Sequence, residues 1–133
     1  AILAAATTLA WSAQAQQQGV TKDQVVLGSI QDLSGPLAGF SKPAKNGMQM
    51  RVDEINAAGG VHGRKIKLVV EDSGYDPKKG LLATQKLIQQ DKVFAIVGAL
   101  GAVDHAAFAD ICGSLPDVVN CRQEAYVWVC QGQ

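Results

Sequence analysis

The sequence predicts an α/β fold with a βαβαβ unit whose parallel strands have a flavodoxin-like or Rossmann-like order. Three observations lead to this prediction. Apolar runs alternate along the chain with segments of helical periodicity. The runs are nearly continuous, which is typical of parallel strands covered on both faces. The 133 residues, 47% of them hydrophobic, suffice for one core of ordinary domain size.

The first strand is expected over Gln24–Gln31, an apolar run that ends at the turn-forming segment Asp32–Pro36. A helix is expected over Ala44–Ala58, because apolar residues recur there at helical spacing. These residues are Met48, Val52 and Ile55. Gly59-Gly60 can supply the left-handed stop of this helix.

The second half of the unit begins with a strand at Ile66–Val70. A helix should then start at Asp76, whose carboxylate can accept hydrogen bonds from free N–H groups, followed by Pro77, which has no N–H to lose. This helix is expected to end near Asp91-Lys92, and a third strand to run from Val93 to Val97.

Residues 1–15 have the character of a signal-peptide remnant. Ala1–Trp11 is a short apolar run, and Ala13-Gln14-Ala15 matches a signal-peptidase site. The run is shorter than the roughly 20 residues that cross a bilayer. A buried N-terminal helix is the alternative. We expect export, a mature chain from about Gln16, and a disordered linker over residues 16–24.

Charge and cysteine content exclude several function classes. Lys and Arg number 12, as do Asp and Glu, so net charge does not steer the chain toward nucleic acid or an anionic membrane. Cys112, Cys121 and Cys130 are odd in number and fit no common zinc spacing, even with His105. We expect no metal and no cofactor.

The motifs of nucleotide, phosphate and hydrolytic chemistry are missing. The loop Asp32–Gly39 lacks G-x-G-x-x-G. A phospho-accepting receiver domain would have two acidic residues directly after the first strand. Here the acidic pair Glu71-Asp72 follows the second strand, and we interpret these two residues as solvated loop acids. The chain contains the Ser, His and Asp of a nucleophile triad, but no G-x-S-x-G turn places the serine on a strand-to-helix elbow. Those residues are His105, Asp110 and Ser114. We therefore expect no catalytic residue.

The predicted topology indicates where a ligand would bind. In an open parallel sheet, ligands lie outside the carboxyl ends of the strands, near helix N-termini. Three loops reach this edge: Asp32–Pro43, Glu71–Asp76, and the segment from Gly98 onward.

Five motifs stand in order along the middle of the chain. They are Leu33–Ala38 (LSGPLA), Asn46-Gly47-Met48, Glu54–Lys65 (EINAAGGVHGRK), Glu71-Asp72 with Asp76-Pro77, and Val97–Gly101 (VGALG). From about Val25 to Gly101 the chain resembles the branched-chain amino acid binding proteins of bacterial ABC transporters. The resemblance implies a truncated N-terminal lobe of the periplasmic binding protein-like I fold, here residues 25–101. A full receptor closes two such lobes on an amino acid without catalysis.

The resemblance also implies partners and site residues. It implies a periplasmic protein that binds an amino acid, serves an inner-membrane ABC permease, and is monomeric when full length. Phe40 would pack on the ligand, with Ser34 and Gly35 in the same loop. Where the family has a Ser or Thr after the third strand, this chain has Ala102, so the backbone N–H groups of Gly101 and Ala102 would take the ligand carboxylate next to Leu100.

Residues 102–133 show none of these motifs, and we hypothesise that this atypical tail comes from a shifted reading frame. A three-stranded sheet would leave strand edges open, so we expect a marginally stable fragment that binds weakly. A small exported or cytoplasmic flavodoxin-like enzyme, or a receiver-type signalling domain, is the alternative function. Uncleaved protein in the cytosol would favour that alternative.

Overall fold

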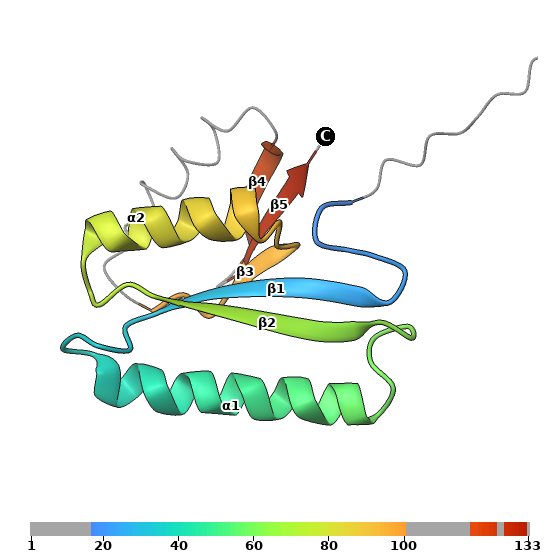
Figure 1. Ribbon diagram of the computed structural model, residues 1–133, viewed down its shortest axis with the longest axis horizontal. Coiled ribbons are helices and arrows are strands. Elements are labelled where there is room, and N and C mark those ends of the chain that lie inside the picture. The colour runs from blue at the N-terminus through green and yellow to red at the C-terminus, as the bar shows by residue number, and fades with distance from the viewer. Residues whose placement is uncertain (1–16, 101–117, 125–126, 133) are drawn as a thin grey trace, which may run out of the picture.

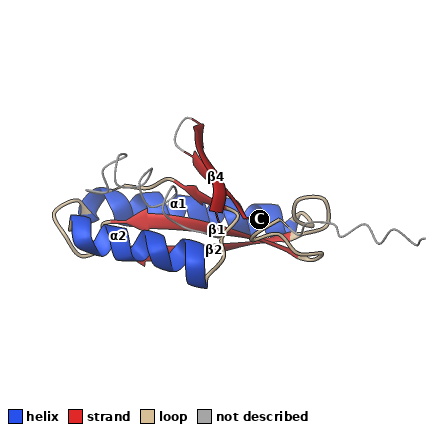
Figure 2. Ribbon diagram, turned by 90° about the horizontal axis from the view of Figure 1, so that it is seen from above, coloured by secondary structure: helices blue, strands red, loops and turns tan. Residues whose placement is uncertain are grey.

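The computed structural model describes residues 17–100, 118–124 and 127–132. These residues form a five-stranded sheet that lies between two helices (Figures 1 and 2). The strands are β1 (Gln24–Gln31), β2 (Lys65–Asp72), β3 (Ala95–Val97), β4 (Val118–Glu124) and β5 (Val127–Gly132). Their order across the sheet is β2-β1-β3-β5-β4.

The first three strands confirm the predicted parallel α/β unit. β1 is central: it pairs in parallel with β2 from Gln24↔Lys65 to Gln31↔Asp72, and on its other side with β3 at Leu27↔Ala95. The order β2-β1-β3 is that of a flavodoxin-like sheet. All three strands therefore end at the same edge.

Helix α1 (Ala38–Ala57) starts six residues before the predicted helix. The prediction treated Pro43 as part of a loop, but Pro43 lies inside the helix. Its missing N–H would have bonded the carbonyl of Gly39, and Gly39 is exposed. Water can therefore satisfy that carbonyl, and the helix continues through the proline.

Helix α2 (Pro77–Gln85) starts where the sequence predicts. One carboxylate oxygen of Asp76 accepts hydrogen bonds from the N–H groups of Lys78 (2.7 Å) and Lys79 (3.1 Å). A π-helical turn, η1 (Lys86–Gln90), continues the helix, and the N–H of Asp91 bonds the carbonyl of Lys86 at 3.0 Å.

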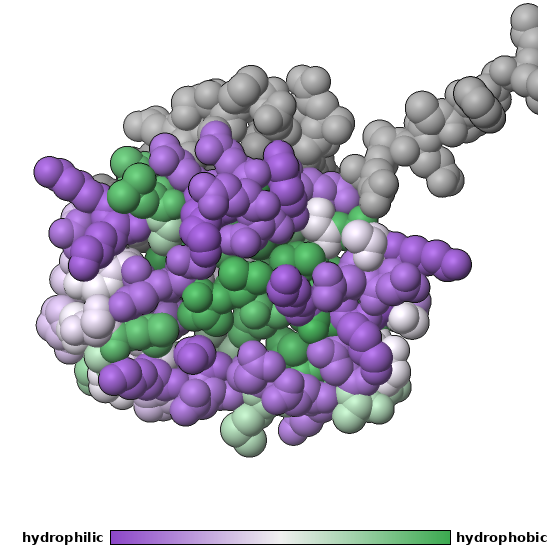
Figure 3. Space-filling view, viewed as in Figure 1, coloured by the Kyte–Doolittle hydropathy of each residue, from purple (hydrophilic) through white to green (hydrophobic). Residues whose placement is uncertain are grey.

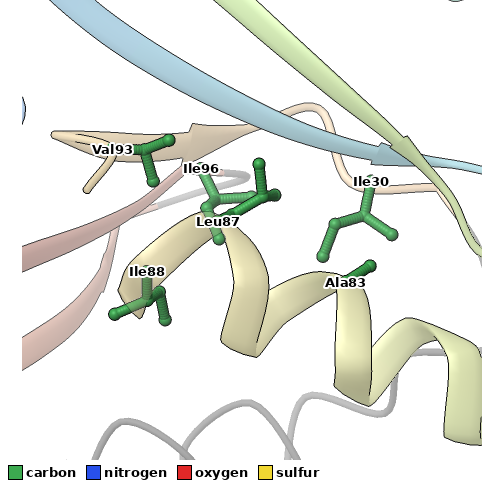
Figure 4. Close-up of a cluster of buried hydrophobic side chains, with 6 residues drawn as sticks. All are labelled: Ile30, Ala83, Leu87, Ile88, Val93 and Ile96. Carbon is green, nitrogen blue, oxygen red and sulfur yellow. The ribbon is translucent and has the colours of Figure 1, made fainter. Parts of the chain in front are cut away.

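The main core lies between the sheet and the α2–η1 helix (Figure 4). Its buried members are Ile30, Ala83, Leu87, Ile88, Val93 and Ile96. Burial of each large aliphatic side chain contributes about 1.5–3 kcal/mol. The other face packs on α1, where Val52 is the one buried hydrophobic residue of the helix. Of the three apolar residues expected at helical spacing in the first helix, Val52 is buried, and Met48 and Ile55 are half-buried.

The expectation that β3 has an open edge is wrong. β5 pairs antiparallel with β3, from Ala95↔Val129 to Val97↔Val127, and β4 pairs antiparallel with β5. The register places Cys121 opposite Cys130. The tail lacks the alternating pattern of a half-buried hairpin, so the sequence did not indicate these strands. β2 remains at the end of the sheet.

Residues 17–24 differ from the disordered linker that we expected. The side-chain amide of Gln18 donates to the carbonyls of Ile88 (3.1 Å) and Val93 (3.2 Å). Gly19 lies so close to Phe94 that an added Cβ would be 2.1 Å from its nitrogen. This segment is therefore anchored to η1 and to the residues just before β3.

Several sequence-based expectations fall on residues outside the described ranges. They concern the export segment 1–15, Gly101, Ala102, His105, Asp110, Cys112 and Ser114. Within the described residues, neither helix combines the length and the apolar character that a membrane crossing requires.

Candidate functional site

The carboxyl edge of the parallel strands brings together the three loops predicted to form the site. β1 and β2 end in register, at Gln31↔Asp72. The chain after β3 reaches the same level, because the N–H of Leu100 donates to the carbonyl of Ile30 at 2.8 Å and Leu100 forms a parallel bridge with Gln31. The loops that follow β1, β2 and β3 therefore begin side by side.

Asp32 organises the loop between β1 and α1. Its side chain is fully buried, and its two carboxylate oxygens accept hydrogen bonds from the N–H groups of Gly35 and Leu37, each at 2.6 Å. An added Cβ at Gly35 would lie 2.6 Å from both an Asp32 oxygen and the Gly74 carbonyl. The loop therefore requires glycine at position 35, and the hydrogen bonds to the buried Asp32 carboxylate stabilise its conformation.

Asp72 joins this first loop to the second. One of its oxygens accepts hydrogen bonds from the N–H groups of Leu33 (2.8 Å) and Gly74 (2.9 Å). The hydroxyl of Ser34, together with these N–H groups, lowers the pKa of the Asp72 carboxyl below its ordinary value. The sequence-based interpretation of Asp72 as a solvated acid is therefore incomplete: the side chain is exposed, but it holds two loops together.

Gln31 holds the third loop. Its side chain is fully buried on the last residue of β1, and its amide nitrogen donates to the Gly98 carbonyl and to the hydroxyl of Ser29 (2.9 Å). Gly98 has a φ of 59°, and an added Cβ would lie 2.9 Å from the sulfur of Met48. The turn after β3 is thus fixed from β1 and from α1.

Among the candidate ligand-binding residues, Phe40 has the freest side chain. It lies in the first turn of α1 and is 73% exposed. The polar groups of three other candidates have internal partners. The N–H of Gly35 bonds Asp32, the hydroxyl of Ser34 bonds Asp72, and the N–H of Leu100 bonds Ile30. Gly101 and Ala102 lie outside the described residues.

Tyr75 is a second exposed aromatic residue at this edge that sequence reasoning missed. It lies between β2 and α2, is 44% exposed, and has a φ of 59°. The available signal was a single aromatic residue between Asp72 and Asp76. The site therefore offers aromatic surface from the first turn of α1 and from the loop between β2 and α2.

The three aspartates of this edge bind main-chain N–H groups. Asp32, Asp72 and Asp76 each accept such bonds. Among the described residues, no group of three His, Cys, Asp or Glu side chains is placed to hold a metal ion. The arrangement is that of a shaped polar rim with exposed aromatic side chains, which suits noncovalent ligand binding.

The sequence profile of a family described as periplasmic binding proteins matches residues 24–114, more than half of the chain. An amino acid binding protein of Pseudomonas aeruginosa is 39% identical over 74 residues. That alignment covers 56% of this chain and 20% of the Pseudomonas protein. The chain thus spans about a fifth of the length of the curated relatives that it matches first.

Among the solved structures that are similar to this chain, two illustrate the range of named ligands. One is the branched-chain amino acid transporter substrate binding protein LivJ from Streptococcus pneumoniae in complex with isoleucine, with 34% identity and a TM-score of 0.61. The match covers 68% of this chain and 26% of LivJ. The other is a fatty acid ABC transporter substrate-binding protein from Thermomonospora curvata, with 35% identity and a TM-score of 0.65. Here the match covers 74% of this chain and 25% of that protein.

Proposed function

This chain belongs to the periplasmic binding protein family, and on that premise we propose that it is part of the solute-binding component of an ABC importer for a branched-chain amino acid. Relatives are named as amino acid or Leu/Ile/Val-binding proteins. The proposal extends that role to this chain and includes export to the periplasm, delivery of the ligand to a membrane permease, and no catalysis.

The observation that carries the proposal is the exposed aromatic surface of Phe40 beside three loops at the carboxyl edge of the sheet. This is the edge at which open α/β sheets bind ligands. A side chain that is 73% exposed gains apolar contact when a ligand covers it. We propose that Phe40 packs against the aliphatic side chain of the amino acid.

The other candidate residues have supporting roles in this proposal. The backbone N–H groups of Gly101 and Ala102 bind the ligand carboxylate. Ser34, Gly35 and Leu100 shape the edge, because their own hydrogen-bonding groups serve the loops. A ligand that lacks a carboxylate would lose the contact with the N–H groups and bind more weakly.

A fatty acid is the second candidate ligand, because one similar structure is named for fatty acid transport. Both ligand classes present a carboxylate and an aliphatic group. They differ in the ammonium group and in the length of the apolar chain. A test must therefore include both.

Thermal unfolding with added ligand tests the proposal. A ligand at 100 times its dissociation constant stabilises the folded state by about 2.7 kcal/mol. We expect isoleucine, leucine or valine to raise the unfolding midpoint, and octanoate to leave it unchanged. An upward shift with octanoate alone would mean that the ligand is a fatty acid. If none of the three amino acids nor octanoate shifts the midpoint at concentrations up to about 1 mM, the proposed ligand binding is contradicted.

A matched pair of variants locates the site. Phe40→Ala should abolish the ligand-induced shift and leave the midpoint without ligand almost unchanged, because the side chain is exposed. Met50→Ala is the control, since Met50 is a 65% exposed hydrophobic residue of the same helix. A ligand-induced shift that survives Phe40→Ala would show that the ligand does not pack on Phe40, and equal loss in both variants would show that the loss is not specific to Phe40.

A further inference from the structure

β2 has a main-chain edge that faces away from the sheet. Among the described strands it pairs with β1 alone. The N–H of Lys65 donates to Asp23 and that of Ser73 to Gln31, both toward β1. Because main-chain groups alternate in direction along a strand, odd-numbered residues of β2 bond β1 and even-numbered residues point outward.

At the first outward position, Ile66, the main-chain N–H and C=O already have hydrogen-bond partners. The side-chain amide of Asn56, at the end of α1, donates to the carbonyl of Ile66 at 2.8 Å and accepts from its N–H at 2.7 Å. The next outward positions, Leu68 and Val70, have no hydrogen-bond partner within the described part of the chain. The open part of the edge is therefore short and lies toward the end of β2.

The surface along this edge is apolar. Figure 3, in the view of Figure 1, shows apolar surface over the strands between hydrophilic borders formed by the helices. Leu68, Val69 and Val70 are half-buried, and Leu82 of α2 is 63% exposed. A pocket of about 240 Å³ beside the edge is lined by Glu71, Asp72, Lys79, Leu82, Ala83 and Lys86. An unpaired strand with such surroundings is a site for strand addition.

Charges on β2 are divided between its two ends. Val69 packs against the core beneath α2, and Glu71 forms an ion pair with Lys86 of η1, so both side chains lie on the α2 face. Side chains alternate between faces, so Lys67 lies on the same face. Lys67 is exposed, and no ion pair joins it to another described residue. The strand thus has a cation before Val69 and an anion after it.

We propose that two copies of this chain associate through β2, with the two strands antiparallel about a twofold axis at Val69. In this register Leu68 lies opposite Val70 of the second copy, and each exchanges its outward N–H and C=O with the other. Lys67 lies opposite Glu71 of the second copy, on the same face of the joined sheet. The interface is isologous, so both contacts occur twice.

The hydrogen bonds and the charges together favour this register. Shifting it so that Leu68 lies opposite Leu68 of the second copy would place Val70 against Ile66, whose main-chain groups Asn56 already occupies. Parallel pairing in register would place Lys67 beside Lys67. Antiparallel pairing instead places opposite charges together, and such cross-strand pairs are stabilising. This charge complementarity identifies a second copy of the chain as the occupant.

The test is the oligomeric state of the whole chain and of two charge-reversal variants. We expect sedimentation equilibrium to show a reversible dimer below about 1 mM, the limit of weak affinity. Lys67→Glu or Glu71→Lys alone should raise the dissociation constant by about tenfold or more, because each variant places like charges opposite each other. An equimolar mixture of the two variants should recover a heterodimer, since the opposite charges again face each other.

Two further variants complete the design. Lys42→Glu makes the same charge change at an exposed position of α1 and should dimerise as the unmodified chain does. Val70→Pro removes one outward N–H and no bond to β1. It should therefore abolish the dimer even if Glu71→Lys does not fold. A monomeric unmodified chain, dimers insensitive to Lys67→Glu, or no recovery from two folded variants would each overturn the proposal.

Discussion

Replacing Asp32 with asparagine should remove a large part of the stability of this lobe, although the change exchanges only one oxygen for an amide nitrogen. The Asp32 carboxylate is fully buried and accepts one N–H on each oxygen, from Gly35 and Leu37, at 2.6 Å each. The asparagine side chain has a single acceptor oxygen. Its NH₂ group would face a backbone N–H, so two donors would oppose each other in a buried site.

The size of the loss follows from these two bonds. A hydrogen bond to a charged group contributes about 1.5–3 kcal/mol, and a neutral one about 1 kcal/mol. Asp32→Asn loses one charged bond and weakens the other to a neutral one. We therefore expect the free energy of unfolding to fall by about 3 kcal/mol, a substantial share of the 5–15 kcal/mol typical of a domain.

Urea unfolding followed by circular dichroism measures this change. Asp53→Asn is the control, because Asp53 is exposed on α1 and bonds only the side chain of Gln49 among the described residues. It should change the free energy by less than about 0.5 kcal/mol. If Asp32→Asn is as mild as the control, the buried carboxylate does not fasten the first loop, and the reasoning is refuted.

Two further predictions concern the other loops. The lowered pKa of Asp72 means that the folded state favours its carboxylate. Its contribution to stability is therefore present above the ordinary pKa of 3.8 and is lost as the pH falls through the lower, folded-state value. In acid titrations of unfolding free energy, Asp72→Asn should flatten the profile below pH 3.8, modestly because the side chain is exposed; an unchanged profile contradicts this. Gly98→Ala should lower the free energy of unfolding by about 1–2 kcal/mol, because the φ of Gly98, 59°, is left-handed. Gly47→Ala is the comparison. It should raise the free energy of unfolding by about 0.5–1 kcal/mol, because Gly47 lies in α1 and an added Cβ there meets nothing within 4 Å. Equal effects of the two glycine changes in urea unfolding would count against the strained turn.

Local chemistry made most of the lobe predictable. The start of α2 followed from Asp76 and Pro77, whose roles depend on adjacent residues alone. The strands followed from apolar runs, and β1 has the predicted bounds. The start of α1 was missed because Pro43 is a strong local signal for a boundary, and the exposure of Gly39, whose carbonyl water can reach, offsets that signal. That compensation depends on exposure, which sequence spacing does not report.

The candidate site was less predictable because polar groups at the strand ends find partners far away in sequence. Gln31 is a polar residue at the end of the predicted strand and Asp32 begins the predicted loop, yet both are fully buried. Asp72 bonds the N–H of Leu33 across two loops. Such pairings arise only after strands come into register, so composition and spacing do not reveal them. The hairpin of β4 and β5 was missed for a different reason: the tail carries no alternating pattern.

The central position of β1 has a consequence for the order of events during synthesis. β1 is made first, but its partner Lys65 follows only after α1, and its other partner Ala95 only after α2. Closing these loops costs entropy before any strand pairing compensates for it. The strand β1 therefore has no partner strand, and its apolar side chains stay uncovered, until most of the lobe has left the ribosome. In an exported protein that delay would keep the chain open for translocation.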